Sequence, residues 1–82
     1  MRLGNQLKRY RFERGDMSQD SLAKAIGVTR QTIISIEKGR FVPSTLLTLK
    51  LARFFGRPVE EIFHIIDDGA GEAGGESSGF TR

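Results

Sequence analysis

Residues 18 to 39 restrict the fold of this chain more than any other segment, because they predict two short helices joined by a tight turn. Ser18 and Thr29 stand where the helices would begin, and a hydroxyl there accepts a hydrogen bond from free backbone N–H groups of the first turn. Gly27 and Gly39 stand where they would end, since glycine adopts the left-handed conformation that closes many helices. We therefore expect two capped helices that hold one side of the second helix away from the domain.

The second of these helices, expected at 30–38, has an apolar and a polar side. Ile33 and Ile36 point inward at a spacing of three, whereas polar side chains stay outside. An arginine can make two hydrogen bonds to guanine in the major groove of DNA, and a glutamine can make two to adenine. The pattern predicts base contacts by Arg30, Gln31 and Ser35. The alternative is an ordinary solvated helix surface, since every exposed helix has polar residues outside.

The apolar spacing predicts three further helices, at 3–13, 45–55 and 59–63. Ser44 caps the second of them, and Pro58 stands just before the third. Residues 64–66 either end the last helix or form a short strand. The predicted fold is all-α, a compact five-helix bundle, with that short C-terminal strand left open. We expect its core to contain the apolar residues of all the helices: Leu3, Leu7, Tyr10, Leu22, Ala23, Ile26, Ile33, Ile36, Leu47, Leu51, Ala52 and Phe55.

The composition changes at Asp67. Residues 67–82 contain five of the ten glycines, and serine and acidic residues fill most of the remainder. Such a segment buries too little apolar surface to offset its ordering entropy, so we expect a disordered tail at 67–82 after a domain at 1–66. The tail has a net charge of −3, which leaves +6 on residues 1–66 of the total of +3. A basic domain favours a polyanionic partner, although many surface lysines only face solvent.

The size and composition of the chain argue against several classes of protein. Its 82 residues leave room for one core, and no run of about 18 apolar residues predicts a membrane span. The absence of Cys and of an apolar signal sequence favours a cytoplasmic protein. His64 has no catalytic partner in the pattern, and Glu60 and Glu61 complement a helix dipole. We expect no enzyme activity, no metal and no cofactor.

An ordered set of short motifs runs along the chain: Leu7-Lys8-Arg9-Tyr10-Arg11, Met17-Ser18-Gln19, Leu22-Ala23, Ile26-Gly27-Val28-Thr29-Arg30-Gln31-Thr32-Ile33, Ile36-Glu37-Lys38-Gly39, Pro43-Ser44 and Phe55-Gly56. In this order and at these spacings, residues 3–63 resemble the helix-turn-helix repressors of the lambda-repressor and Cro type, the Xre-like group. They are most similar to its short five-helix bacterial and archaeal members. The resemblance implies a lambda-repressor-like DNA-binding domain.

The resemblance implies two kinds of contact with double-stranded DNA. Bases would be read from the start of the recognition helix, 30–38, by the three polar residues named above. Backbone phosphates would be bound by Gln19, at the positive end of the preceding helix, and by four residues around the recognition helix: Thr29, Thr32, Lys38 and Arg40. Gln19 could instead be a plain first-turn polar residue, and the loop cations could be solvated charges.

The resemblance also implies a structural ion pair between Arg11 and Glu37, which lie at the margins of two apolar stripes. Such a pair, buried or half-buried between the first and third helices, would orient the recognition helix. One departure from the family is the turn at 15–18, which is one residue longer than usual.

These features predict a sequence-specific DNA-binding transcriptional regulator, most often a repressor that occludes a promoter. We expect a homodimer on a palindromic operator. Several apolar residues exceed what the core needs and favour self-association, with a wider core contact as the alternative: Leu46, Leu49, Phe54, Ile65 and Ile66. A second function, from another class, is an antitoxin-like module that neutralises a partner protein through the tail and its Phe80 while also binding DNA.

Overall fold

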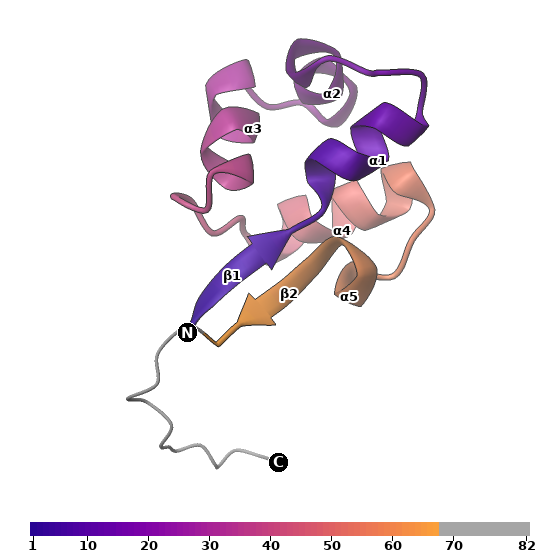
Figure 1. Ribbon diagram of the computed structural model, residues 1–82. Coiled ribbons are helices and arrows are strands. Elements are labelled where there is room, and N and C mark those ends of the chain that lie inside the picture. Colours follow the sequence, from indigo (N-terminus) through magenta and orange to yellow (C-terminus); the bar gives the residue numbers. More distant parts are fainter. Residues whose placement is uncertain (68–82) are drawn as a thin grey trace.

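The computed structural model describes residues 1 to 67, which form five helices and a two-stranded sheet (Figure 1). The five-helix bundle predicted from the sequence is confirmed, and residues 64–66 belong to a strand. Apart from Asp67, the predicted tail lies outside the described residues. The elements follow in this order: β1 (Arg2–Asn5), α1 (Leu7–Glu13), α2 (Gln19–Ile26), α3 (Arg30–Glu37), α4 (Thr45–Phe55), α5 (Val59–Ile62) and β2 (Phe63–Ile66).

The two strands join the ends of the described chain. β1 pairs antiparallel with β2, so that Leu3 lies opposite Ile65 and Gly4 lies opposite His64. The prediction of a helix from residue 3 is therefore wrong, because α1 begins only at Leu7. The spacing of Leu3, Leu7 and Tyr10 fits a helix, but residues 2–5 pair with β2 instead. Leu3 still packs against the core, from a strand.

The predicted helix caps are confirmed. The hydroxyls of Ser18, Thr29 and Ser44 each accept a hydrogen bond from the backbone N–H three residues later, at 2.9, 3.2 and 3.2 Å. Gly27 ends α2 and Gly56 ends α4 in the left-handed conformation, with φ of +79° and +66°. These local signals set where α2, α3 and α4 begin and where α2 and α4 end, whereas α3 ends at Glu37, one residue before its predicted end.

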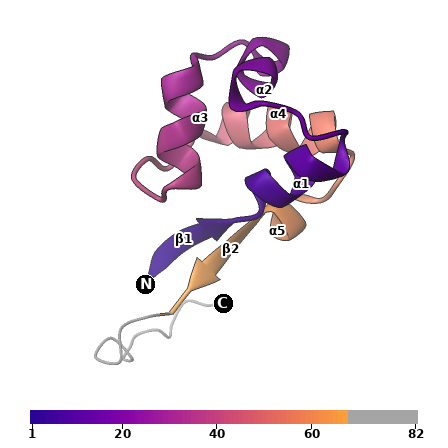
Figure 2. The same cartoon turned by 45° about the horizontal axis from the view of Figure 1, so that its top comes forward.

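The core lies where α1 to α5 meet, with α1 in front of α4 in Figure 2. Tyr10 packs near Phe55 at a ring-centroid distance of 5.8 Å, and its hydroxyl donates to the carbonyl of Glu61. Within residues 1–67, no helix has both the length and the apolar character needed to cross a membrane. The buried apolar residues include nine of those expected from the sequence and add Ile62 and Phe63: Leu7, Tyr10, Leu22, Ala23, Ile26, Ile33, Ile36, Leu47 and Leu51.

The apolar residues expected to favour self-association separate into two groups. Phe54 packs against the core, and the guanidinium of Arg14 lies 4.4 Å from the centre of its ring. For Phe54 the wider core contact is therefore the correct interpretation. Leu46 and Leu49 on α4 and Ile65 on β2 are exposed. Ile66, also on β2, is partly buried and does not belong to the core.

Candidate nucleic-acid interface

The α2–turn–α3 unit presents the first turn of α3 at the surface (Figure 1). Ile33 and Ile36 are buried and fix the rotation of α3 about its axis. Arg30 and Gln31 are consequently exposed, and Ser35 is partly exposed one turn later. The guanidinium and the side-chain amide are the groups best suited to base edges in the major groove.

A shallow hollow lies beside this turn of α3. It brings together five of the residues predicted to contact DNA and one that was not: Thr29, Gln31, Thr32, Ser35, Arg40 and Phe41. Arg30 does not line it. The loop that closes the hollow is held to α3, because the backbone N–H of Arg40 donates to the carbonyl of Ser35 at 2.9 Å. The sequence signal for Phe41 is an aromatic residue in a loop, outside every apolar stripe.

The two threonines of this hollow already use their hydroxyls within the protein. Their Oγ1 atoms lie 2.9 Å apart in a hydrogen bond, and Thr29 Oγ1 also accepts from the backbone N–H of Thr32. Both hydroxyls therefore help to begin α3. Lys38 and Arg40, by contrast, are exposed at the end of α3 and in the loop that follows it. Their positive charges lie at the C-terminal end of α3.

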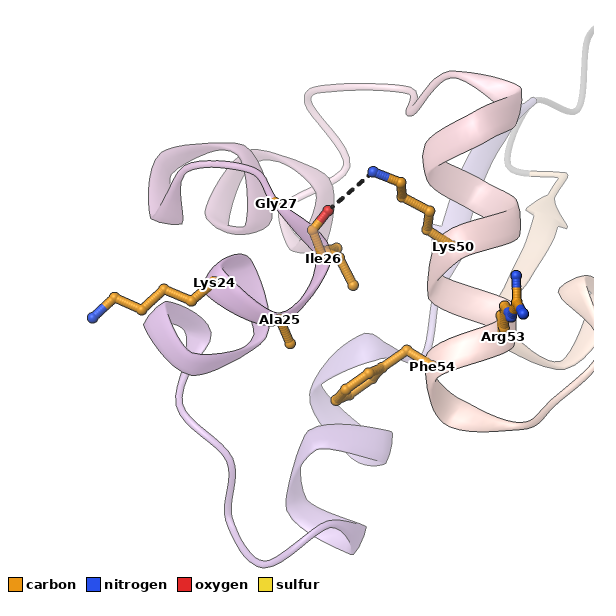
Figure 3. Close-up of a pocket in the computed structure, with 7 residues that line it drawn as sticks. All are labelled: Lys24, Ala25, Ile26, Gly27, Lys50, Arg53 and Phe54. Carbon is orange, nitrogen blue, oxygen red and sulfur yellow. Dashed lines mark hydrogen bonds between the residues drawn. The ribbon is translucent and has the colours of Figure 1, made fainter.

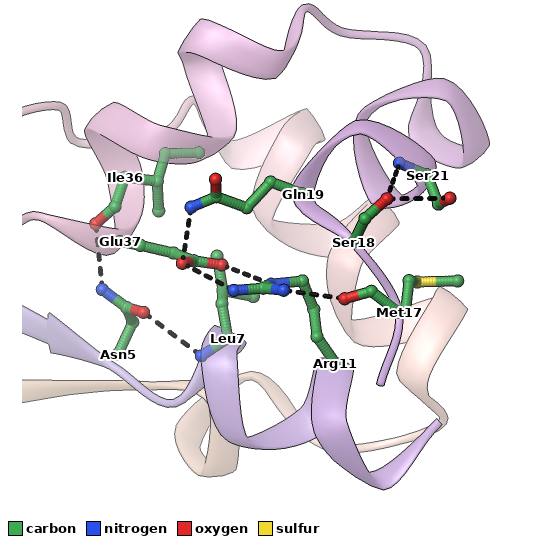
Figure 4. A network of polar contacts seen from close by, with 9 residues as sticks. All are labelled: Asn5, Leu7, Arg11, Met17, Ser18, Gln19, Ser21, Ile36 and Glu37. Atoms are coloured by element: carbon green, nitrogen blue, oxygen red, sulfur yellow. Dashed lines mark hydrogen bonds and ion pairs between the residues drawn. The ribbon is translucent and has the colours of Figure 1, made fainter. Parts of the chain in front are cut away.

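Arg11 and Glu37 lie together between α1 and α3 (Figure 4). Arg11 Nε donates to Glu37 Oε2 at 2.7 Å, and Nη2 donates to Oε1 at 3.1 Å. The geometry is bidentate, which is the strongest arrangement of an arginine and a carboxylate. The side chains are only 8% and 11% exposed, so little water screens the pair. It fastens the last residue of α3 to α1.

The start of α2 joins the same polar network. Gln19 Nε2 donates to Glu37 Oε1 at 3.1 Å, and Arg11 Nη1 donates to the carbonyl of Met17 at 2.7 Å. The turn before α2, although long, is thereby tied to α1. A glutamine amide has two N–H groups, so one bond to Glu37 leaves a second donor of Gln19 for a phosphate. Gln19 is half-buried at the first position of α2.

Asn5 adds a contact that sequence reasoning missed. Its Nδ2 donates to the carbonyl of Ile36 at 2.9 Å, and its Oδ1 accepts from the backbone N–H of Leu7 at 3.2 Å (Figure 4). The signal was an asparagine just before a helix, a position where its side chain often binds the backbone. Asn5 and Arg11 together hold the end of α3 from two elements.

A second hollow lies between α2 and α4 (Figure 3). Lys50 Nζ reaches across it to the carbonyl of Ile26 at 3.4 Å. Ile26 is the last residue of α2, where the helix dipole is negative and a cation is favourable. Lys50 of α4 therefore stabilises the end of α2 next to Gly27. The described residues contain no group of three or more His, Cys, Asp or Glu that could hold a metal ion.

Comparison with known proteins gives matches that include both α2 and α3. A family model described as Helix-turn-helix matches residues 7 to 62. An uncharacterized HTH-type transcriptional regulator of Methanocaldococcus jannaschii is 52% identical over 64 residues, which cover 78% of this chain and 96% of the relative. Control protein C.MunI of a Mycoplasma species is 36% identical, over 82% of this chain and 90% of that protein. The cryptic phage CTXphi transcriptional repressor RstR of Vibrio cholerae is 36% identical, over 71% and 51%.

Proposed function

Because the chain belongs to the helix-turn-helix family, we propose that it is a transcriptional repressor that places α3 in the major groove of operator DNA. The membership confirms the resemblance drawn from the sequence, and with it the general assignment as a DNA-binding transcriptional regulator. The observation that supports the proposal most directly is the exposed Arg30–Gln31 pair at the start of α3. The polar network of Arg11 and Glu37 holds α3 in place behind it.

The proposal divides the contacts by chemistry. Arg30, Gln31 and Ser35 read base edges, whereas Lys38 and Arg40 bind backbone phosphates. Gln19 binds a phosphate at the N-terminus of α2, where its backbone and free amide N–H groups can donate. The hydroxyls of Thr29 and Thr32 bond to each other, which uses one of their two hydrogens, so the pair can donate only one hydrogen bond to a phosphate. We therefore give the two threonines the smaller part of the phosphate binding.

The proposed repressor acts as a homodimer on a palindromic operator. A two-fold dimer would place two copies of α3 in successive major grooves. Leu46 and Leu49 are exposed one turn apart on α4, and a second copy of the chain would cover them. Since operators of bacteria and archaea lie in the cytoplasm, the proposal places the protein there. The antitoxin-like alternative depends on the tail, which lies almost entirely outside the described residues, so no observation favours it.

Selection of bound sites from random-sequence duplexes tests this proposal. The full chain should enrich a short sequence repeated with two-fold symmetry, at a half-site spacing of about one helical turn. The matched control is the double variant R30A/Q31A, which leaves the core and the polar network intact and should enrich no such sequence. If the wild-type chain enriches no sequence above the control, the chain is not a sequence-specific regulator.

A further inference from the structure

We infer that Phe41 contacts the C5 methyl group of a thymine, so that the hollow beside α3 recognises A·T base pairs of the operator. The inference rests on the proposed function, because it assumes that α3 lies in the major groove. It adds a specificity-determining residue outside the recognition helix.

Phe41 and Phe12 are the two phenylalanines of the described residues that do not pack against the core. Phe41 is 46% exposed and does not belong to the hydrophobic core or to the residues packed against it. It lines the hollow together with Gln31, Ser35 and Arg40, whose side chains are polar. The ring therefore forms the apolar wall of a hollow whose other walls offer hydrogen-bonding groups.

The loop that carries Phe41 is short and fixed at both ends. The backbone N–H of Arg40 donates to Ser35 at its start, and Pro43 is buried just before the capping residue of α4. Because the backbone is held in this way, little entropy is lost when the ring meets DNA. An exposed ring on a backbone held in this way can meet a ligand without rearrangement of the loop.

The chemistry of the major groove indicates what this wall would meet. Among the bases, only thymine shows an apolar group there, the C5 methyl, while adenine shows an acceptor and a donor. A glutamine can bind both of those adenine groups. Gln31 and Phe41 border one hollow, so a polar and an apolar wall face the same stretch of groove. Gln31 would bind the adenine and Phe41 would contact the thymine methyl, in one A·T pair or in two neighbouring A·T pairs.

Deletion of single methyl groups tests the inference. The enriched duplex is prepared with each thymine replaced in turn by deoxyuridine, and affinities are measured by fluorescence anisotropy at fixed salt. For wild type, one replacement in each half-site should weaken binding about fourfold, the effect of one buried methyl group. For F41A, which removes the ring from both subunits of the proposed dimer, the unmodified duplex should bind about sixteenfold more weakly, and that same replacement should have no further effect.

Two further variants are controls for the double-mutant cycle that F41A and the thymine replacement form. F41L keeps an apolar side chain and should retain a measurable methyl effect. F12A removes a ring that is 52% exposed on α1, and should reproduce the wild-type pattern at every thymine. Thermal unfolding followed by circular dichroism establishes that each variant is folded at the assay temperature.

The outcomes separate this inference from the proposed function. If wild type and F41A respond alike to every replacement, the ring does not contact a thymine methyl and the inference fails, while sequence-specific binding stands. The same holds if F41A binds the unmodified duplex as tightly as wild type does. If wild type enriches no duplex, the proposed function fails and the inference falls with it.

Discussion

Arg11 and Glu37 hold opposite charges in a place that water hardly reaches. They make two hydrogen bonds to each other. Arg11 also donates to the carbonyl of Met17, and Glu37 also accepts from the side chain of Gln19. Among the described residues, no buried side-chain polar atom lacks a partner, so the network is fully satisfied. Removal of one ion would leave the other as an uncompensated buried charge, which costs about 3–5 kcal/mol in such pairs.

The variant Glu37→Ala should therefore lower the free energy of unfolding by about 3–5 kcal/mol, measured by urea denaturation. Asp20→Ala is the matched control, because Asp20 pairs with Lys24 in a geometry that exposes both side chains by more than half. An exposed pair of this kind contributes at most about 1 kcal/mol. A loss for Glu37→Ala as small as that for Asp20→Ala would show that the network does not stabilise the fold.

Single side chains at the start of α3 should determine which sequence is bound. Arg30→Ala and Gln31→Ala should each cost about 1–3 kcal/mol on the preferred operator and relax selectivity at one or two base pairs. Both residues are exposed, so the fold should not change. Binding to single-base variants of the operator measures the effect. An equal loss on every duplex would assign both residues to phosphate binding and contradict base recognition.

At the scale of elements, the sequence predicts helix boundaries better than it predicts the pairing of distant strands. Serine and threonine caps predict where α2, α3 and α4 begin, and glycines predict where α2 and α4 end, because each signal acts within a few residues. The strand β1 was missed, since its partner β2 lies at the other end of the domain. Gly4 was a usable warning, because glycine is unfavourable inside a helix.

The sequence also predicts the exposure of the candidate base-contacting residues, but not every residue that lies near them. Arg30, Gln31 and Ser35 lie on the exposed side of α3, as the spacing of Ile33 and Ile36 indicates. Phe41 and Asn5 were not foreseen. Their roles depend on which elements pack beside α3, and neither residue belongs to a periodic pattern. Contacts between distant elements need the tertiary structure, whereas faces of single helices do not.

Asn5 gives an element-scale prediction, because its side chain ties the start of α1 to the end of α3. Asn5→Ala should lower the free energy of unfolding by about 1–3 kcal/mol, since it leaves the carbonyl of Ile36 and the N–H of Leu7 without these bonds. Gln6→Ala is the matched control, because the Gln6 side chain does not cap α1. Equal denaturation midpoints for the two variants would contradict the proposed tie.

At the scale of the whole molecule, net charge determines how DNA binding responds to salt. Residues 1–66 have a net charge of +6, whereas residues 67–82 have −3. Affinity for DNA should therefore fall steeply with salt, as counterions are released from the phosphates. Cations near α3 should contribute to this slope, and cations on other surfaces should contribute little.

Lys38→Ala and Arg40→Ala should weaken binding to all duplexes alike. Each should reduce the slope of log affinity against log salt by about one unit per subunit, which is about two units for the proposed dimer. Lys8→Ala on α1 is the matched control, because it removes the same charge from another element. Titrations at several salt concentrations, on operator and on unrelated duplexes, measure both effects. A slope that changes equally for Lys8→Ala would show that net charge, and not the surface after α3, sets the affinity.

The proposed dimer gives a prediction about the assembled molecule. Leu46 and Leu49 are 66% and 53% exposed on α4, so Leu46→Glu and Leu49→Glu should leave the monomer folded while placing a charge in the interface. In sedimentation, wild type should be a dimer and both variants monomers, and the variants should lose tight binding to a palindrome while retaining weaker binding to one half-site. Ile65→Glu, which alters an equally exposed residue of β2, should remain dimeric. A wild-type chain that stays monomeric with and without operator would refute the dimer, and dissociation caused only by Ile65→Glu would move the interface from α4 to the sheet.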